Sequence, residues 1–152
     1  MGEYLEHIQN KPQCGLYLRN FNFEDVPALQ KDIQDLGLFD PSKHELVIRG
    51  AFIGLKNTYT LLHQDTGENL LTCLNGEKLM VLVPKAEKDK LGTEGRDRPF
   101  TPEEIADPKT HPMFANVDNL HVIRLKPGDM LYIPMGWLHY VHNLADWNVS
   151  IS

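Results

Sequence analysis

The chain has 152 residues, of which 41% are hydrophobic and 24% charged, the proportions of an ordinary globular domain. Its 15 basic and 21 acidic residues give a net charge of −6 without any block of basic residues, which argues against a broad phosphate-binding surface. Cys14 and Cys73 are too few and too far apart for a disulfide framework, and no apolar run approaches the roughly 20 residues of a membrane span. We therefore expect one domain over residues 1–152 that lies in the cytoplasm or nucleus and has no membrane partner.

The N-terminal part of the chain combines a short helical region with the first strands. The sequence predicts a strand over Leu16–Arg19, and apolar residues at three- and four-residue spacing predict a helix near Val26–Leu36. β-Branched and aromatic residues then predict two strands, His44–Leu55 and Thr58–His63, which a Lys56-Asn57 turn separates.

The middle of the chain predicts two strands and a long polar loop. The strands are Asn69–Leu74 and Lys78–Val83, and the Asn75-Gly76 dipeptide between them is a strong signal for a β-hairpin. The segment Lys85–Phe100 is polar and carries glycines, so we expect it to be a loop.

The rest of the chain begins with a short helix and ends in strands. Thr101 at the N-cap, Pro102 at the first helical position and Glu104 predict a capping box and a helix that ends near Ala106. The remaining predicted strands are Asn119–Leu125, Met130–Ile133, Tyr140–Asn143 and Asn148–Ser152. Seven or so short strands predict a mostly β fold, a sandwich or closed barrel, with a short N-terminal helical region. Because the strand pattern still runs at the last residues, we expect the domain to be truncated at its C-terminal end.

A candidate metal site comes from three side chains on separate stretches of the chain. His63 and Asp65 are two residues apart, so in an extended segment they point to the same face while Gln64 points away. His139 must then reach them from another strand. Two imidazoles and one carboxylate are the ligand set of the facial triad in non-haem Fe(II) oxygenases. His142 is the rival for the third ligand, but in an extended segment it faces the side opposite to His139.

Two further side chains have alternative interpretations. Lys78 stands at the start of an apolar strand, and its ammonium either reaches solvent along its aliphatic stem or supplies a fixed positive charge for a carboxylate inside the barrel. Thr60 precedes His63 by three residues and falls on the opposite face of a regular strand. It reaches the site only if that strand is bulged or bent.

Taken together, Thr60–Pro84 and Leu125–Ser152 resemble the JmjC, or cupin-like, 2-oxoglutarate oxygenases, and above all the hydroxylase-type branch of that family. The likeness extends upstream to Tyr17-Leu-Arg-Asn and covers most of the chain. The 15-residue interval between His63 and Lys78 matches the hydroxylase-type branch. The resemblance implies the fold of that family, a double-stranded β-helix or jelly roll.

The resemblance also implies an enzyme with Fe(II), 2-oxoglutarate and O₂ as cofactor and co-substrates. The implied metal ligands are His63, Asp65 and His139, and the implied 2-oxoglutarate-binding residues are Tyr17, Thr60, Asn69 and Lys78. The implied reaction is hydroxylation of a C–H bond, most of all on a protein side chain. A tRNA base and N-methyl demethylation are the alternatives within the family, and a non-catalytic cupin-fold binding module is the alternative of another class. The oligomeric state stays open.

Overall fold

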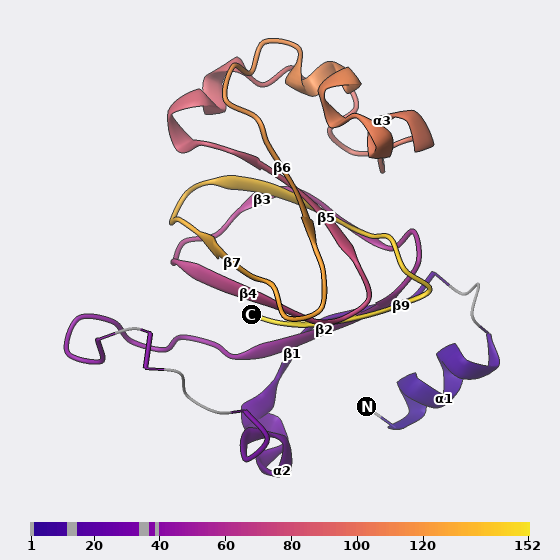
Figure 1. The fold of residues 1–152 in the computed structure, drawn as a ribbon, viewed down its shortest axis with the longest axis vertical. Coiled ribbons are helices and arrows are strands. Elements are labelled where there is room, and N and C mark those ends of the chain that lie inside the picture. The colour runs from indigo at the N-terminus through magenta and orange to yellow at the C-terminus, as the bar shows by residue number, and fades with distance from the viewer. Residues whose placement is uncertain (1, 12–14, 34–36, 39) are drawn as a thin grey trace.

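A computed structural model describes residues 2–11, 15–33, 37–38 and 40–152, which form two antiparallel sheets (Figure 1). The five-stranded sheet has the order β1-β2-β9-β4-β7, with bounds Tyr17–Asn22, Gly50–Leu55, Trp147–Ile151, Asn69–Asn75 and Met130–Ile133. The four-stranded sheet has the order β3-β8-β5-β6, with bounds Tyr59–Gln64, Leu138–Asn143, Lys78–Val83 and His121–Leu125. Two such sheets with few helices confirm the predicted mostly β, jelly-roll architecture.

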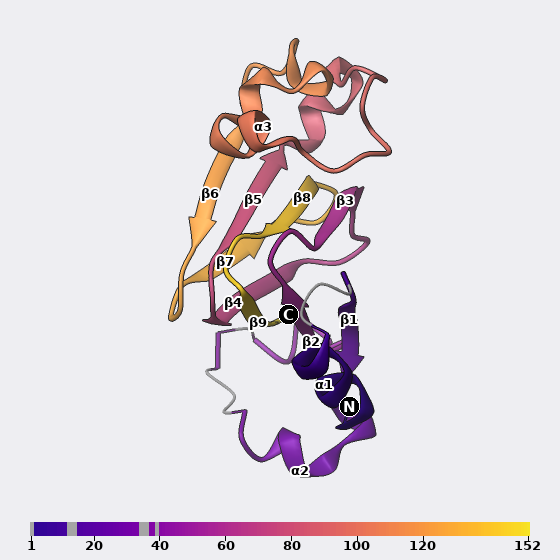
Figure 2. The same cartoon turned by 90° about the vertical axis from the view of Figure 1, so that its right-hand side faces the viewer.

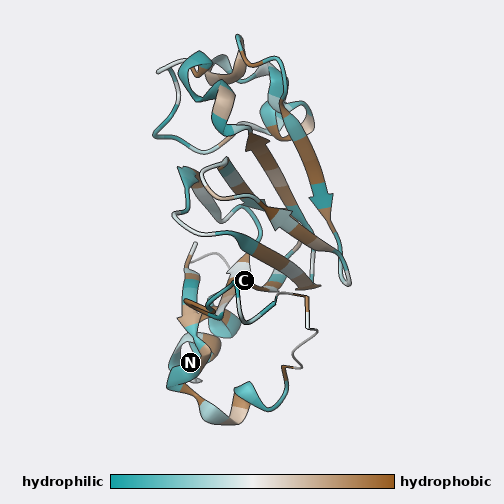
Figure 3. Ribbon diagram, turned by 90° about the vertical axis from the view of Figure 1, so that its left-hand side faces the viewer, coloured by the Kyte–Doolittle hydropathy of each residue, from teal (hydrophilic) through white to brown (hydrophobic). Residues whose placement is uncertain are grey.

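Strand β5 is buried on both faces and separates the two main apolar clusters. Met80 and Leu82 point between the sheets, where they pack with Leu71 of β4 and other residues from both sheets. Leu79 and Val81 alternate with them and pack under the segment between β5 and β6. Figure 3 shows these strongly hydrophobic strands in the middle of the molecule. Because Lys78 has the parity of Met80, its side chain also starts on the inner face.

Helical segments lie at the two ends of the molecule (Figure 2). At one end are α1 (Gly2–Asn10), η1 (Phe23–Asp25) and α2 (Pro27–Gln30), near the outer face of the five-stranded sheet. At the other end, between β5 and β6, are η2 (Lys85–Lys90), α3 (Pro102–Ala106), η3 (Pro108–Thr110) and η4 (Pro112–Phe114). None of the described helices is long and apolar enough to cross a membrane.

The capping box predicted at the start of α3 is confirmed. Thr101 Oγ1 accepts a hydrogen bond from the Glu104 amide at 3.3 Å, and Glu104 Oε2 accepts one from the Thr101 amide at 2.8 Å. The helix ends at Ala106, as its sequence predicts. The segment before it is not wholly a loop, because Lys85–Lys90 forms a 3₁₀ helix.

Two elements are shorter than the sequence predicts. The helix expected near Val26–Leu36 is reduced to Pro27–Gln30, and residues 34–36 lie outside the described part of the chain. None of the α2 residues is fully buried, and Leu29 and Ile33 pack only partly against the cluster around Phe23, so little apolar burial supports a longer helix. The strand expected over His44–Leu55 begins only at Gly50, because Val47, 85% exposed, and its neighbours find no apolar surface to cover.

The hairpin predicted at Asn75-Gly76 is wrong. The flanking strands β4 and β5 belong to different sheets, so this turn carries the chain from one layer to the other. Gly76 has φ +85, and a Cβ there would lie 2.4 Å from the Trp147 carbonyl oxygen. The glycine is therefore required for a close approach to another strand as well as for the turn.

Candidate functional site

The structure brings together the three predicted metal ligands. His63 of β3 is paired directly with His139 of β8, and Asp65 follows the end of β3. The ligand atoms of these three residues all lie within 4.8 Å of one another. Asp65 Oδ2 is 3.6 Å from His139 Nε2, and Asp65 Oδ1 is 3.9 Å from His63 Nε2. The three donors can therefore converge on one ion and leave the remaining coordination positions open.

Backbone carbonyls orient both imidazoles of the triad. His63 Nδ1 lies 2.8 Å from the Leu61 carbonyl oxygen, and His139 Nδ1 lies 3.4 Å from that of Trp137. With the proton on Nδ1, each ring donates to a carbonyl and presents Nε2 to the shared centre. Burial, followed by the neighbouring His63, lowers the pKa of His139 and favours the neutral imidazole that a metal requires.

Asn69 contacts the carboxylate of the triad. Its Nδ2 donates to Asp65 Oδ2 at 3.3 Å, and its Oδ1 accepts a hydrogen bond from Ser152 Oγ at 2.6 Å. The sequence resemblance implies a role for Asn69 beside the co-substrate. In the structure its direct partner is a candidate metal ligand, which it holds in place from β4.

A β-bulge resolves the parity of Thr60. In the pairing of β3 with β8, Thr60 lies opposite Val141 and His63 opposite His139, so β3 carries one extra residue in this interval. The extra residue returns Thr60 to the side of the strand on which His63 lies. Thr60 also lies near the Tyr17 side chain of β1 and acts to lower the pKa of that hydroxyl.

Lys78 is buried inside the sandwich, only 1% exposed, at the far end of the same inner face. It is paired with Asn143 across β5 and β8, and its Nζ donates to Asn143 Oδ1 at 2.5 Å. Burial lowers the pKa of Lys78 to about 8. Within the described part of the chain, no carboxylate forms an ion pair with this ammonium. Of the two interpretations of Lys78, the structure favours a fixed cation inside the fold.

Tyr17 lies beside Lys78, whose Nζ is 5.5 Å from the centre of the tyrosine ring. Burial raises the pKa of Tyr17 to about 12, although the nearby polar side chains of Asn143 and Thr60 act in the opposite direction. An open cleft of about 1270 Å³, lined mainly by residues of segments 15–19 and 55–63, reaches Tyr17, Thr60 and His63. Solvent and small molecules therefore have a route to the inner face.

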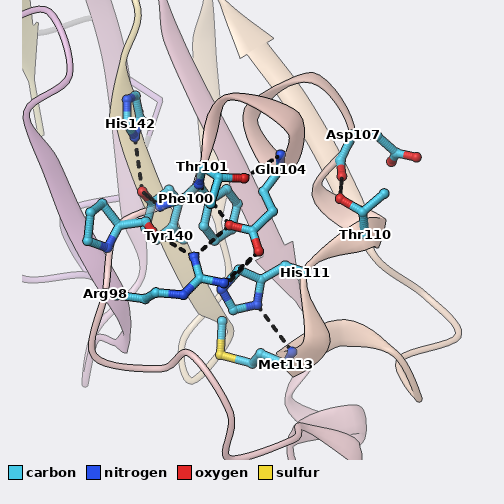
Figure 4. Close-up of polar contacts among 11 residues, drawn as sticks. Arg98, Phe100, Thr101, Glu104, Asp107, Thr110, His111, Met113, Tyr140 and His142 are labelled. Atoms are coloured by element: carbon cyan, nitrogen blue, oxygen red, sulfur yellow. Dashed lines mark hydrogen bonds and ion pairs between the residues drawn. The ribbon is translucent and has the colours of Figure 1, made fainter.

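The rival ligand His142 points away from the triad. It shares with Tyr140 the face of β8 that packs under the segment between β5 and β6, and its Nδ1 is 3.0 Å from the Tyr140 hydroxyl (Figure 4). Burial lowers the pKa of His142 to about 4. Figure 4 also shows Glu104, whose two oxygens each accept a hydrogen bond from Arg98 at 2.7 Å. This cluster connects the segment between β5 and β6 to the four-stranded sheet.

Sequence reasoning missed Asn143 and Thr58, two buried polar residues behind Lys78. Asn143 Nδ2 donates to Thr58 Oγ1 at 2.7 Å, and both side chains are buried. One signal was present in the sequence, because Asn143 has the parity of His139 along β8 and is therefore a polar residue facing the interior. Its partner depends on strand register, which the sequence does not reveal.

Comparison with known proteins agrees with this geometry. The family model for cupin-like domains matches residues 1–152. JmjC domain-containing protein A of Dictyostelium discoideum is 36% identical over 158 residues, which cover 99% of this chain and 60% of that protein. Lysine-specific demethylase 8 of Xenopus tropicalis is 31% identical over 137 residues, covering 86% of this chain and 30% of that protein.

A human relative, named 2-oxoglutarate and iron-dependent oxygenase JMJD4, is 26% identical over 162 residues, covering 99% of this chain and 39% of that protein. The chain thus spans 60% of the Dictyostelium relative and a smaller share of the other two. The chain therefore belongs to the cupin-like domain family, and its relatives place it among the JmjC oxygenases of that family.

Proposed function

We propose that this protein is an Fe(II)- and 2-oxoglutarate-dependent oxygenase that hydroxylates a C–H bond on a protein side chain. One observation carries the proposal: a His-Asp-His triad lies on the same inner face of the sandwich as a buried lysine that has no carboxylate partner among the described residues. The triad is suited to a ferrous ion, and the lysine is suited to the distal carboxylate of a dicarboxylate.

The spacing of the two groups fits a short dicarboxylate. His139 and Asn143 are four residues apart on β8, about 13 Å along the strand. The Lys78 side chain extends from the Asn143 end, and the triad donors lie at the His139 end. A five-carbon dicarboxylate placed between them can direct one carboxylate to the metal and the other to the ammonium.

The residues of this chain hold and orient the reactants. His63, Asp65 and His139 would bind the ion, with Asn69 steadying the carboxylate. Lys78 would hold the distal carboxylate, with Tyr17 and Thr60 as neighbouring hydroxyl donors. When bound, iron and 2-oxoglutarate supply the oxidising chemistry, in which O₂ converts 2-oxoglutarate to succinate and CO₂ and one oxygen atom enters the substrate C–H bond.

Succinate release and peptide mass together test the function. The protein is incubated with Fe(II), 2-oxoglutarate and cell-extract peptides, and we expect succinate together with peptides heavier by one oxygen atom. Asp65→Ala should abolish both because it removes the carboxylate of the triad. His7→Ala is the matched control, since His7 is exposed on α1, and it should leave both unchanged.

Three further assays with the same protein identify the alternatives. Formaldehyde release from methylated peptides would identify an N-methyl demethylase, and an oxidised tRNA base would identify a tRNA hydroxylase. Thermal stabilisation by neither Fe(II) nor 2-oxoglutarate would contradict the proposal and favour a non-catalytic binding module.

A further inference from the structure

The Lys78 ammonium is fixed by a neutral residue. Its Nζ donates to Asn143 Oδ1 at 2.5 Å, with Lys78 1% and Asn143 0% exposed. A buried ammonium is normally paired with a carboxylate, because the charge is otherwise poorly compensated. An amide oxygen satisfies one N–H donor but adds no charge. The positive charge of Lys78 is thus held in place without being neutralised by any residue that the structure describes.

The direction of the Asn143 amide follows from a chain of hydrogen bonds. The Thr58 hydroxyl donates to the Leu55 carbonyl oxygen at 2.7 Å, so its oxygen is free only to accept. The Asn143 atom that lies 2.7 Å from it must therefore be the amide nitrogen. The amide oxygen is then left facing Lys78. A flipped amide would point its N–H groups at the ammonium and its oxygen at the Thr58 hydroxyl oxygen, whose hydrogen is already donated to the Leu55 carbonyl.

The neighbouring strand leaves space for this arrangement at Gly54. A Cβ at Gly54 would lie 2.6 Å from Asn143 Nδ2, 2.6 Å from Thr58 Oγ1 and 2.7 Å from the Tyr17 ring. Only glycine lets the β2 backbone pass so close to the three side chains. The cradle behind Lys78 is thus built by β1, β2, β5 and β8 together.

The titratable groups around Lys78 add no negative charge at neutral pH. In the part of the chain that the structure describes, they are Tyr17 from β1 and Cys73 from β4. Burial raises the pKa of Tyr17 to about 12 and also raises the pKa of the Cys73 thiol. Both groups are neutral when Lys78 is protonated, so no fixed anion among the described residues competes for the ammonium.

We propose that Asn143 is a positioning residue for the dicarboxylate. Its amide oxygen orients the Lys78 ammonium and leaves the positive charge available to the ligand. This inference rests on the proposed function, because the ligand is the co-substrate. Thr58 fixes the amide orientation, and the neutrality of Asn143 is the property that matters. A carboxylate in its place would neutralise Lys78 in advance and compete with the ligand.

The test compares Asn143→Asp, Thr58→Val and Thr58→Ser in 2-oxoglutarate titrations of the protein loaded with Mn(II) without oxygen. Asn143→Asp keeps the size of the side chain and should weaken 2-oxoglutarate binding roughly tenfold or more, because a charged pair replaces the free ammonium. Thr58→Val removes the acceptor that orients the amide and should weaken binding several-fold, whereas Thr58→Ser should restore it. The Mn(II) affinity should stay unchanged in all three variants.

A pH series separates positioning from a merely structural role. Wild-type affinity should fall above about pH 8, where free Lys78 loses its proton, while Asn143→Asp should keep Lys78 protonated to higher pH and give a flatter profile. Wild-type-like affinity in Asn143→Asp and Thr58→Val would overturn the inference and leave the proposed function standing. Failure of the wild type to bind 2-oxoglutarate would overturn both. If Asn143→Asp does not fold, equal affinities of Thr58→Val and Thr58→Ser overturn the inference.

Discussion

The buried ammonium of Lys78 determines which ligands the interior of this sandwich can bind. Lys78 starts a strand that is otherwise apolar, and its charge is expensive in the free protein because it lies away from water. Its pKa of about 8 reflects this penalty. A ligand carboxylate relieves the penalty, so ligand binding and the charge state of one lysine are linked.

Lys78→Met should expose this penalty directly. The free wild-type protein binds fewer protons at Lys78 than the unfolded chain does between about pH 8 and pH 10, so its stability relative to the variant should rise with pH in that window. The expected rise is roughly 2–3 kcal/mol, from the shift of the pKa. Chemical denaturation of both proteins at several pH values measures it, and 2-oxoglutarate should stabilise only the wild type. A pH-independent difference between the two proteins would contradict the prediction.

Asn69→Ala should weaken metal binding by about tenfold, because it removes the hydrogen bond that steadies Asp65. Titration with Mn(II) gives the affinity. Asn75→Ala is the matched control on the same strand, since Asn75 is exposed and its side chain bonds only the Trp147 carbonyl among the described residues. Equal losses in both variants would show that β4 as a whole, rather than the contact with Asp65, supports the metal.

Among the secondary-structure elements, the extra residue in β3 and the short helix α3 determine how nearby side chains are oriented. The bulge in β3 gives Thr60 and His63 a common side although their spacing is odd. In α3, the capping residue Glu104 also binds Arg98 and lies beside His111. The bulge thus sets the side of β3 on which Thr60 lies, and the capping carboxylate links α3 to the segments before and after it.

The capping carboxylate of α3 should make the stability of the protein sensitive to acid. Arg98 and then the Thr101 amide lower the pKa of Glu104 to about 2, so its contribution is present above its ordinary pKa and is lost as the pH falls toward 2. Glu104→Gln should cost about 1–2 kcal/mol at pH 7 and much less at pH 3. Glu103→Gln, at an exposed position of the same helix, is the control and should change little. Urea denaturation at both pH values measures the difference.

Local patterns in the sequence predict much of the fold. The bounds of β5 and β7 and the capping box at Thr101 follow from residue types within a few positions of one another. The shared face of His63 and Asp65 follows from strand parity. Each of these features depends on neighbours in the chain, so no knowledge of the partner strand is needed.

Features that depend on strand partners could not be predicted. Asn75-Gly76 has the composition of a hairpin turn, but its role depends on the sheet that each flanking strand joins. Asn143 could be assigned to the interior by parity, yet its contacts with Lys78 and Thr58 arise from the pairing of β8 with other strands. Helix α1 carries one buried residue, Ile8, and its pattern is too weak to predict a helix.

At the scale of the whole molecule, β9 inserts between β2 and β4, although Ala51 of β2 and its partner Ile151 are far apart in sequence (Figure 1). Until β9 is in place, β2 and β4 each have one edge with unpaired backbone N–H and C=O groups. During synthesis or refolding, the gap between β2 and β4 can accept strand β9 of a second copy of the chain. We therefore expect slow maturation and domain-swapped by-products at high protein concentration, because such long-range pairing forms late.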